Sequence, residues 1–367
     1  MAEERARSFA PLDGEVDRFL RTPLGAALRE EGPEGDVAVS SRVRLARNLR
    51  EFPFPTAMRP RDAQAVLTRV ESALAAFPDA AQYVRIRMGE IPPFARGILV
   101  EKHLISPLLA ENPAGAVIVR QDEAVSLMVN EEDHLRLQTF AAGLALQEAY
   151  READHVDDLL AAHLDIAFDP RYGFLTACPT NVGTGMRASV MLHLPALALT
   201  RTLGQVVEAV QKVGLVVRGI YGEGTEAEGN LYQVSNQVTL GLSEGELLEN
   251  LLGIARQVIE QERRARDVLL REDRVALEDR IYRSYGILTS ARRISTREAM
   301  ERISDVLLGV HLGLVQGIPS RALRELWVMI RPNFLQYTFG ESLGPAERDE
   351  RRAVLIRRHL KEAMARG

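Results

Sequence analysis

The sequence predicts an α+β fold, in which helices flank an antiparallel β-sheet and an all-helical C-terminal domain follows. Apolar segments with strand-like spacing recur up to about residue 240, whereas apolar residues at helical spacing dominate after Ser243. The chain of 367 residues is 46% hydrophobic and 26% charged, which is typical of a globular protein of about two domains. We therefore expect a lead-in segment at 1–35, a mixed domain at 36–265 and a helical domain at 266–367.

Residues 37–45 form the clearest predicted strand, because apolar and polar residues alternate along them. Val39 and Val43 are expected on the core face, while Arg42 and Arg44 project together from the other face. Further strands are expected at residues 83–88, 116–120, 125–130, 187–194, 215–221 and 231–240. The second and third of these are close enough in sequence to form an antiparallel hairpin.

The spacing of apolar residues predicts helices at 143–160 and 196–213, between the expected strands. Farther along, Ser243 and Ser295 each stand three residues before a glutamate, the pattern of a capping box that opens a helix. From the second box to the C-terminus the sequence is almost entirely helical in pattern and rich in arginine. This change of pattern is the reason for expecting a helical C-terminal domain.

The composition argues against several classes of protein. A net charge of −5 disfavours a general nucleic-acid binder, and no apolar run reaches the roughly 18 residues that span a membrane. The first residues lack the apolar core of a signal peptide and Cys178 is the only cysteine, so we expect a cytoplasmic protein without an internal disulfide. Scattered histidines and the lack of any Cys-x-x-Cys argue against structural zinc.

Lysine is rare in this chain, and arginine supplies 43 of the 46 basic residues. The three lysines are Lys102, Lys212 and Lys361. No Gly-Lys-Ser/Thr sequence is therefore present, which excludes a standard phosphate-binding P-loop, and the His-Arg-Asp and Asp-Phe-Gly elements of eukaryote-type protein kinases are also missing. If this protein binds phosphate, arginine must do it.

Four segments could carry chemistry, and each also has an ordinary structural interpretation. Arg42 and Arg44 could hold a polyphosphate bidentately, or could lie on a solvated strand face. Residues 130–136, Asn-Glu-Glu-Asp-His-Leu-Arg, could set a carboxylate against a cationic substrate and Arg136 against an anion, or could form a structural loop.

The other two segments are rich in glycine. In residues 178–190 the glycines permit tight turns that could place Cys178 and Arg187 beside one cavity, although a lone cysteine is usually buried and inert. Residues 222–229 contain three glutamates and form either a surface hairpin loop or a mobile lid that carries a base.

Taken together, these segments resemble the ATP:guanido phosphotransferases, the family of creatine and arginine kinases. The matching stretches are residues 40–44, 130–136, 178–185, 187–190 and 229–236, in the same order and spacing over 36–260. The resemblance implies the guanido kinase catalytic domain for the mixed part of the chain. It also implies ATP and Mg²⁺ as cofactors.

The chain departs from the small-substrate kinases of this family at both ends. Those kinases carry a helical domain before the Ser-Ser-Arg-Val-Arg strand, and with only 39 residues before Ser40 we expect that domain to be absent. The added C-terminal domain contains Arg348-Asp-Glu-Arg-Arg-Ala353 and is similar to that of the bacterial members that phosphorylate arginine side chains in proteins. Two alternatives stay open: a kinase of a free guanidino compound, and a catalytically silent adaptor that keeps the fold.

The resemblance also assigns roles to residues. A guanidinium, with a pKa above ~12, must lose a proton as its nitrogen attacks phosphorus, and carboxylates suit this task. Glu226 is implied as the general base, Glu132 as its orienting partner and Cys178 as a polarisable contact beside the guanidinium. The implied nucleotide-binding residues are Ser41, Arg42, Val43, Arg44, His103, Arg136, Arg187, Ala188, Ser189, Val190, Met191, Arg218, Gly219, Ile220, Tyr221, Gly222 and Glu223.

Some of these positions differ from the family pattern. Met191 stands where the small-substrate kinases place a histidine, and Tyr221 where they often place another arginine. In the C-terminal domain, Pro345 suits the first turn of a helix that would carry the Arg348 motif. The implied phosphoarginine sensor consists of Arg348, Asp349, Arg352 and Ala353, with Arg348 and Arg352 one helical turn apart.

The resemblance further implies the partners of the protein. We expect protein substrates with exposed arginine, an activator protein, the protein-degradation machinery and a role in the stress response. A homodimer is expected through the helical domain, and neither a membrane nor a nucleic acid is expected as a direct partner.

Overall fold

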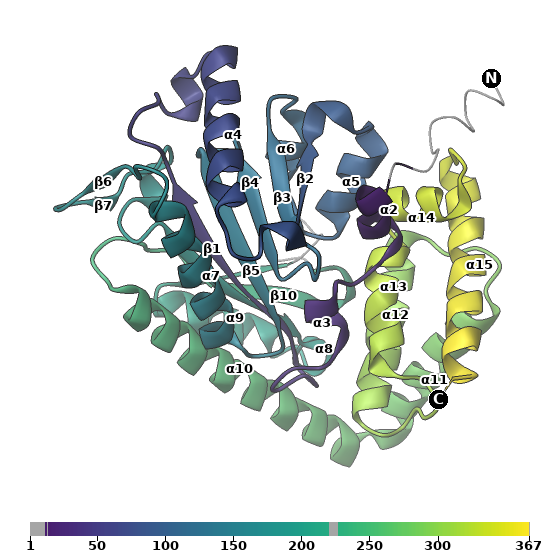
Figure 1. Cartoon of the computed structure of the whole chain (residues 1–367). Coiled ribbons are helices and arrows are strands. Elements are labelled where there is room, and N and C mark those ends of the chain that lie inside the picture. Colours follow the sequence, from purple (N-terminus) through teal and green to yellow (C-terminus); the bar gives the residue numbers. More distant parts are fainter. Residues whose placement is uncertain (1–11, 13, 220–226, 367) are drawn as a thin grey trace.

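An eight-stranded antiparallel sheet forms the centre of the protein in the computed structural model, which describes residues 12, 14–219 and 227–366 (Figure 1). The strand order is β2-β3-β4-β5-β1-β8-β10-β9. The strands are β1 (Ala38–Arg47), β2 (Tyr83–Arg87), β3 (Ala116–Arg120), β4 (Val125–Val129), β5 (Leu135–Ala142), β8 (Met186–His193), β9 (Leu215–Gly219) and β10 (Leu231–Asn236). A separate small hairpin pairs β6 (Phe168–Asp169) with β7 (Gly173–Phe174).

Helices flank this sheet and also form a separate group at the C-terminal end, which confirms the predicted fold class (Figure 1). Those around the sheet are α2 (Gly14–Arg21), α3 (Ala26–Arg29), α4 (Pro60–Ala75), α5 (Pro93–Glu101), α6 (Pro107–Glu111), α7 (Leu146–Ala161), α8 (Pro195–Leu199), α9 (Leu203–Lys212) and α10 (Glu244–Glu272). The C-terminal group contains α11 (Arg274–Ser290), α12 (Thr296–His311), α13 (Ser320–Met329), α14 (Pro332–Phe339) and α15 (Pro345–Met364). Across the described ranges, no helix combines the length and apolar character needed to cross a membrane.

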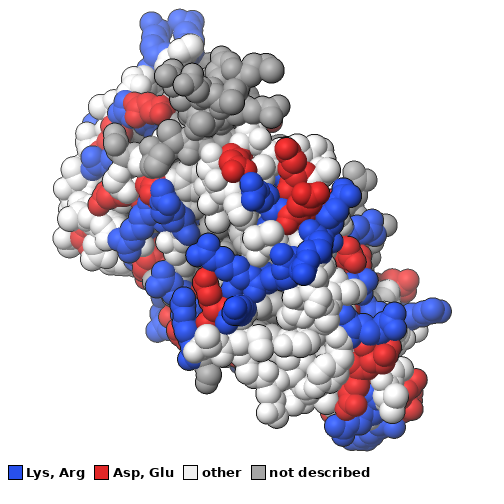
Figure 2. All heavy atoms as spheres, turned by 90° about the vertical axis from the view of Figure 1, so that its right-hand side faces the viewer, with Lys and Arg blue, Asp and Glu red and all other residues white. Residues whose placement is uncertain are grey.

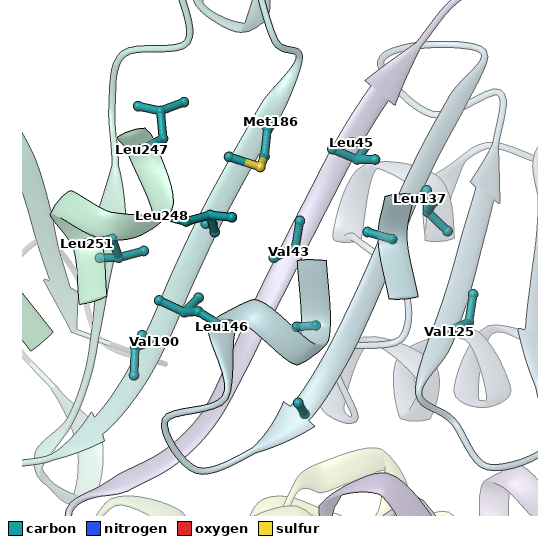
Figure 3. Packing of buried hydrophobic residues seen from close by; sticks show 14 of the residues in the cluster. Val43, Leu45, Val125, Leu137, Leu146, Met186, Val190, Leu247, Leu248 and Leu251 are labelled. Atoms are coloured by element: carbon teal, nitrogen blue, oxygen red, sulfur yellow. The ribbon is translucent and has the colours of Figure 1, made fainter. Parts of the chain in front are cut away.

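One face of the sheet forms the main hydrophobic core with α4, α7, α9 and α10. Figure 3 shows Val43 and Leu45 of β1 and Val190 of β8 in this layer, near Leu248 and Leu251 of α10. All five side chains are at most 2% exposed. Burying one such side chain stabilises the folded state by about 1.5–3 kcal/mol relative to leaving it exposed. Because this layer is fully packed, a ligand must bind at the opposite face of the sheet.

The opposite face is covered at its two ends by different helices. Helices α2 and α5 pack over β2, β3 and β4 in a second apolar cluster. At the other end, the C-terminal helices form a third cluster that reaches Leu231 of β10 and Met191 of β8. Between these two covers lie the middle strands, and this is where the predicted arginines project.

Helices begin at both predicted Ser-x-x-Glu sequences, and in the described structure the first of these starts has both reciprocal bonds of a capping box while the second has one of them. The Ser243 side chain accepts a hydrogen bond from the Glu246 N–H while the Glu246 carboxylate accepts from the Ser243 N–H, and Ser295 accepts in the same way from Glu298. Helix α10 runs on to Glu272, past the predicted domain limit at residue 265, and passes beneath the sheet towards the C-terminal helices (Figure 1). The domain limits therefore stay a prediction.

Three elements differ from the sequence prediction. Strand β5 was not predicted, because polar residues interrupt its apolar alternation. The helix expected at 196–213 is two helices, α8 and α9, separated by Arg201 with φ +59°. The strand expected to reach residue 240 ends at Asn236, whose side chain accepts from the Ala188 N–H and donates to the Met186 carbonyl.

Val39 faces the side of the sheet opposite to the one predicted. The pairing of β1 with β8 shifts between Ala38, which lies opposite Leu192, and Ser40, which lies opposite Met191. Val39 is thus an extra residue, a β-bulge that reverses the alternation of the strand at this point. Its side chain lines a cavity with Arg42 and packs against the C-terminal helices instead of the main core.

A buried ion pair joins the end of α5 to the turn between β3 and β4. The Lys102 ammonium lies 2.6 Å from a Glu123 carboxylate oxygen and donates to the Phe19 carbonyl at 2.7 Å. We expect Lys102→Met to lower the free energy of unfolding by about 3–5 kcal/mol, because the Glu123 charge would stay buried without its partner. Chemical denaturation should show that Lys102→Met with Glu123→Gln regains much of the loss, and that Lys212→Met at an exposed site has little effect. Equal stability of all three variants would contradict this expectation.

Candidate active site

Arginine side chains from neighbouring strands gather on the open face of the sheet. Arg42 and Arg44 project from β1, Arg136 from β5 and Arg187 from β8, and Arg44 lies directly opposite Arg187 in the strand pairing. Arg218, an exposed residue of β9, adds a further positive charge near Arg187. Like charges placed opposite each other repel, so this arrangement is unfavourable unless an anion joins it.

The electrostatics of the cluster agree with this interpretation. Burial lowers the pKa of the Arg44 guanidinium well below its ordinary value, and Arg42, Arg136 and Arg187 lower it further by repulsion. Burial and repulsion by Arg218 and Arg136 also lower the pKa of Arg187. Within the described part of the chain, the buried Nε atoms of Arg44 and Arg187 have no hydrogen-bond partner. An oxyanion would supply both the missing acceptor and the missing negative charge.

Two cavities open on this cluster. One of about 460 Å³ is lined by Arg42, Arg44, Arg136 and His103, with Arg331 from the loop before α14. The second, of about 140 Å³, shares Arg44 and Arg136 with the first and adds Glu132, Cys178, Asn181 and Arg187. The two spaces meet along Arg44 and Arg136, so an elongated anion in the first would reach the second.

The acidic segment before β5 supplies the carboxylates of the smaller cavity. Arg136 pairs with Glu131, with 3.1 Å from its Nε to the Glu131 oxygen, and also with Glu132. Burial acts to lower the pKa of Arg136, but these carboxylates and Asp133 raise it overall. Glu131 is buried and also accepts from the Ser106 hydroxyl, whereas 37% of the Glu132 side chain is exposed. Glu132 is therefore the carboxylate of this pair that can meet a substrate.

Asp133 joins the acidic segment to the cysteine loop. Its fully buried carboxylate accepts from the Asn48 amide at 2.7 Å and from the Ala177 N–H at 2.6 Å. Burial raises the pKa of Asp133, while these hydrogen bonds stabilise its charged form. Sequence reasoning missed this positioning role, because nothing in the spacing indicates that Asn48 and residue 177 lie beside the same carboxylate.

The cysteine loop brings Cys178 to the smaller cavity, together with Arg187, as the glycine-rich sequence suggested. Gly183 has φ +114°, and a Cβ there would lie 2.2 Å from the Thr239 carbonyl oxygen, so this turn requires glycine. The Cys178 Sγ is half-buried, 3.0 Å from the Thr180 hydroxyl. Cys178, Glu132 and Arg187 thus surround one space large enough for a planar cation.

Other residues implied in nucleotide binding take different positions. Val43, Ala188 and Val190 point into the main core. The Ser41 hydroxyl donates a hydrogen bond to the Gly143 carbonyl and accepts one from the Ala145 N–H. These four residues can meet a ligand only through their backbone. Ser189, Met191 and His103 line a neighbouring cavity, and Gly219 ends β9. Ile220, Tyr221, Gly222, Glu223 and Glu226 lie outside the described residues.

The Arg348 motif lies on α15, which begins at Pro345 as predicted. Arg352 is 1% exposed; it donates to the carbonyls of Ile330 and Ile294 and pairs with Asp349 at 2.6 Å. Arg348 is half-buried, and the buried Ala353 packs in the third cluster. Figure 2 views the molecule from the C-terminal side and shows a band of Lys and Arg across it, with Asp and Glu alongside. The predicted clamp of two arginines on one phosphate stays a prediction, since Arg352 is already held by backbone carbonyls.

Two family models match the chain. Residues 65–265 match the ATP:guanido phosphotransferase C-terminal catalytic domain, and residues 274–366 match the protein-arginine kinase McsB C-terminal domain. Among curated proteins, the protein-arginine kinase of Brevibacillus brevis is 52% identical over 94% of this chain and 97% of its own length. That of Bacillus subtilis is 47% identical over 94% and 96%. The chain belongs to the protein-arginine kinase family.

Solved structures show the same fold in more distant relatives of this kinase family. Lombricine kinase is 22% identical with a TM-score of 0.57, over 71% of this chain and 75% of its own. The duplicated taurocyamine kinase from Schistosoma mansoni, solved with transition state analogue components, is 24% identical with a TM-score of 0.59, over 72% of this chain and 39% of its own. Membership in the ATP:guanido phosphotransferases makes this chain a kinase that uses ATP.

Proposed function

We propose that this member of the protein-arginine kinase family transfers the γ-phosphoryl group of ATP to the guanidinium of arginine side chains in proteins. The observation that carries the proposal is the smaller cavity. It places a carboxylate, Glu132, and a thiol, Cys178, directly beside Arg187 and Arg44. Such a space can hold a guanidinium on its acidic side and a transferring phosphoryl group on its basic side.

The proposed reaction needs orientation of the acceptor and removal of a proton. Glu132 holds the substrate guanidinium by charge-assisted hydrogen bonds, and Cys178 contacts its plane. A guanidinium nitrogen forms a bond to the γ-phosphorus as the bond from that phosphorus to the bridging oxygen of ADP breaks. The proton leaves that nitrogen for a carboxylate, which we assign to Glu226. ADP and phosphoarginine are the products.

The arginine cluster stabilises the charge that spreads over the phosphoryl oxygens during transfer. This role is mostly one of position and electrostatics, because a phosphoryl group passes through a loose transition state. Arg44 and Arg187 offer Nε atoms without a partner for this purpose. Mg²⁺ is proposed to neutralise the nucleotide phosphates, bound mainly by them and by water, as is usual for this ion.

One assay separates this proposal from its alternatives. The protein is incubated with ATP and either an unstructured arginine-containing protein or free arginine, and acid-labile phosphate is measured. We expect phosphate on the protein acceptor and little on free arginine. A preference for free arginine would instead indicate a small-substrate guanidino kinase, and no transfer to either acceptor would indicate a silent adaptor.

We also propose that Arg348, Asp349, Arg352 and Ala353 bind phosphoarginine and thereby regulate the kinase. In support, burial lowers the pKa of the Arg352 guanidinium, Asp349 opposes this shift, and the nearby positive charges of Arg348 and Arg331 add to it, so positive charge gathers at this place. We expect calorimetric titration of phosphoarginine to give binding to a chain whose catalytic site is disabled by Glu226→Gln, and to lose it when Arg348→Ala and Asp349→Ala are added. Equal binding by both chains would leave the motif as surface charge.

The remaining expectations concern partners. An activator protein, the degradation machinery, the homodimer and the cytoplasmic location remain predictions of the family resemblance.

A further inference from the structure

A third cavity lies between the sheet and the C-terminal helices. It has a volume of about 130 Å³, with Met191 of β8 and Leu231 of β10 on the sheet side. Trp327 and Val328 of α13 line its other side, and Leu24 of the N-terminal segment also contributes. A mainly apolar cavity with a few polar groups is the usual composition of a small-molecule site.

This apolar cavity adjoins the arginine-lined cavity of about 460 Å³. Arg42 and His103 line both spaces, so a ligand could extend from one into the other. Burial, together with repulsion by Arg42 and Arg331, lowers the pKa of His103 to about 3, so its imidazole is neutral at working pH. A neutral ring packs against an uncharged planar group without a desolvation penalty for charge.

Two residues that line this cavity, Arg324 and Trp327, each have a buried side-chain nitrogen without a hydrogen-bond partner in the described structure, and Trp327 is the aromatic one. The side chain is 5% exposed, and its indole Nε1 is buried without a hydrogen-bond partner among the described residues. The rings of Trp327 and His193 meet edge to face, with 5.9 Å between their centroids. A buried N–H without an acceptor costs about 1–3 kcal/mol, so the absence of a partner calls for an explanation.

The helix that carries Trp327 is fixed in position by polar contacts. Arg324, one turn earlier on α13, donates to the carbonyls of Leu28 and Arg29. On the sheet side, the His193 Nε2 lies 2.8 Å from the Ser304 hydroxyl of α12, which joins β8 to the C-terminal helices. These contacts attach α13 to the N-terminal segment and α12 to the sheet.

We propose that Trp327 is a specificity-determining residue of the nucleotide site, which packs against the base of ATP and donates its indole N–H to an acceptor nitrogen of that base. The C-terminal helical region thus completes a site that the catalytic domain would otherwise leave open on one side. The inference rests on the proposed use of ATP as phosphoryl donor. It assigns the base to the apolar cavity and the phosphates to the neighbouring arginines.

The test uses the fact that the sequence contains a single tryptophan. Its intrinsic emission therefore reports on this one position in the full chain. We expect ADP to change the emission with saturation, and inorganic tripolyphosphate to leave it unchanged while displacing ADP, because tripolyphosphate occupies the arginines but has no base. Calorimetry on the same samples measures binding independently of the emission.

Three outcomes would overturn the inference. The first is calorimetric binding of ADP without any change in emission, and the second is an equal emission change with tripolyphosphate. The third is the absence of ADP binding, which would also overturn the proposed function. If ADP changes the emission as expected but no arginine is phosphorylated, the inference stands and only the proposed function fails.

A substitution adds a second, independent readout. Trp327→Phe keeps an aromatic ring and removes only the N–H and part of the ring area. We expect the KM for ATP to rise roughly 3–10-fold with kcat nearly unchanged, which is the effect of losing one hydrogen bond in binding. The preference for ATP over GTP should fall in parallel. Tyr172→Phe, at an exposed aromatic residue, is the matched control, and an unchanged KM and base preference in Trp327→Phe would contradict the proposal.

Discussion

Replacement of Arg187 by lysine is expected to reduce kcat/KM for ATP by at least about 10²-fold, the effect of removing one preorganised donor from a transition state. Arg187 lies directly opposite Arg44 in the sheet, and its buried Nε has no partner in the described chain. Its Nη2 reaches the Asn181 side chain at 3.4 Å, which fixes the guanidinium in the smaller cavity. Lysine keeps the charge but cannot present a planar fork to two phosphate oxygens.

The experiment measures initial rates of protein phosphorylation and, separately, the affinity for ADP. Both should fall in Arg187→Lys, since the residue is assigned to the phosphates in the ground state and in the transition state. Arg85→Lys makes the same chemical change at an exposed residue of β2 and should behave as the unmodified protein. If Arg187→Lys bound ADP and turned over as well as Arg85→Lys, the assignment of the phosphate cluster would be wrong.

Local patterns were sufficient to predict most of the fold. Alternation of apolar and polar residues indicated β1, because side chains on a strand alternate between the core and the other face, and strand-like apolar runs indicated β2, β3 and β4. Capping boxes indicated where α10 and α12 begin, since the bonds that open a helix are made within four residues. Strand β5 escaped notice because its alternation holds only from Leu135 to Gln138 and is then broken, since polar Thr139 lies on the core face and apolar Phe140 on the opposite face.

The features that were missed depend on contacts between distant parts of the chain. The bulge at Val39 is visible only in the pairing with β8, and the carboxylate of Asp133 is held by Asn48, 85 residues away. The buried guanidinium of Arg352 donates hydrogen bonds to the carbonyls of residues 294 and 330, which lie far from it in the sequence. The nearness of Cys178 and Arg187 was suggested by the sequence, because turns between them limit their separation. Their catalytic roles remain predictions.

Replacement of Glu226 by glutamine should produce the other large effect, a loss of at least about 10²-fold in kcat, because an amide cannot accept the proton that leaves the guanidinium. Binding of ADP should persist, since the assigned partner of Glu226 is the acceptor and not the nucleotide. The residue lies outside the described part of the chain, so its role is argued from chemistry and from the family resemblance. Glu208→Gln, an exposed site on α9, is the matched control.

The comparison with Glu132→Gln decides between the two carboxylates. Glu132 is paired with Arg136 and lines the smaller cavity beside Cys178, where it can hold the guanidinium of the acceptor. Its loss should therefore weaken the affinity for the protein acceptor, raising KM more than it lowers kcat. Rates measured at several acceptor concentrations separate the two effects. If Glu132→Gln instead lost most of its kcat and Glu226→Gln kept nearly normal turnover, the base would be Glu132, and Arg136 would have to release it before the proton moves.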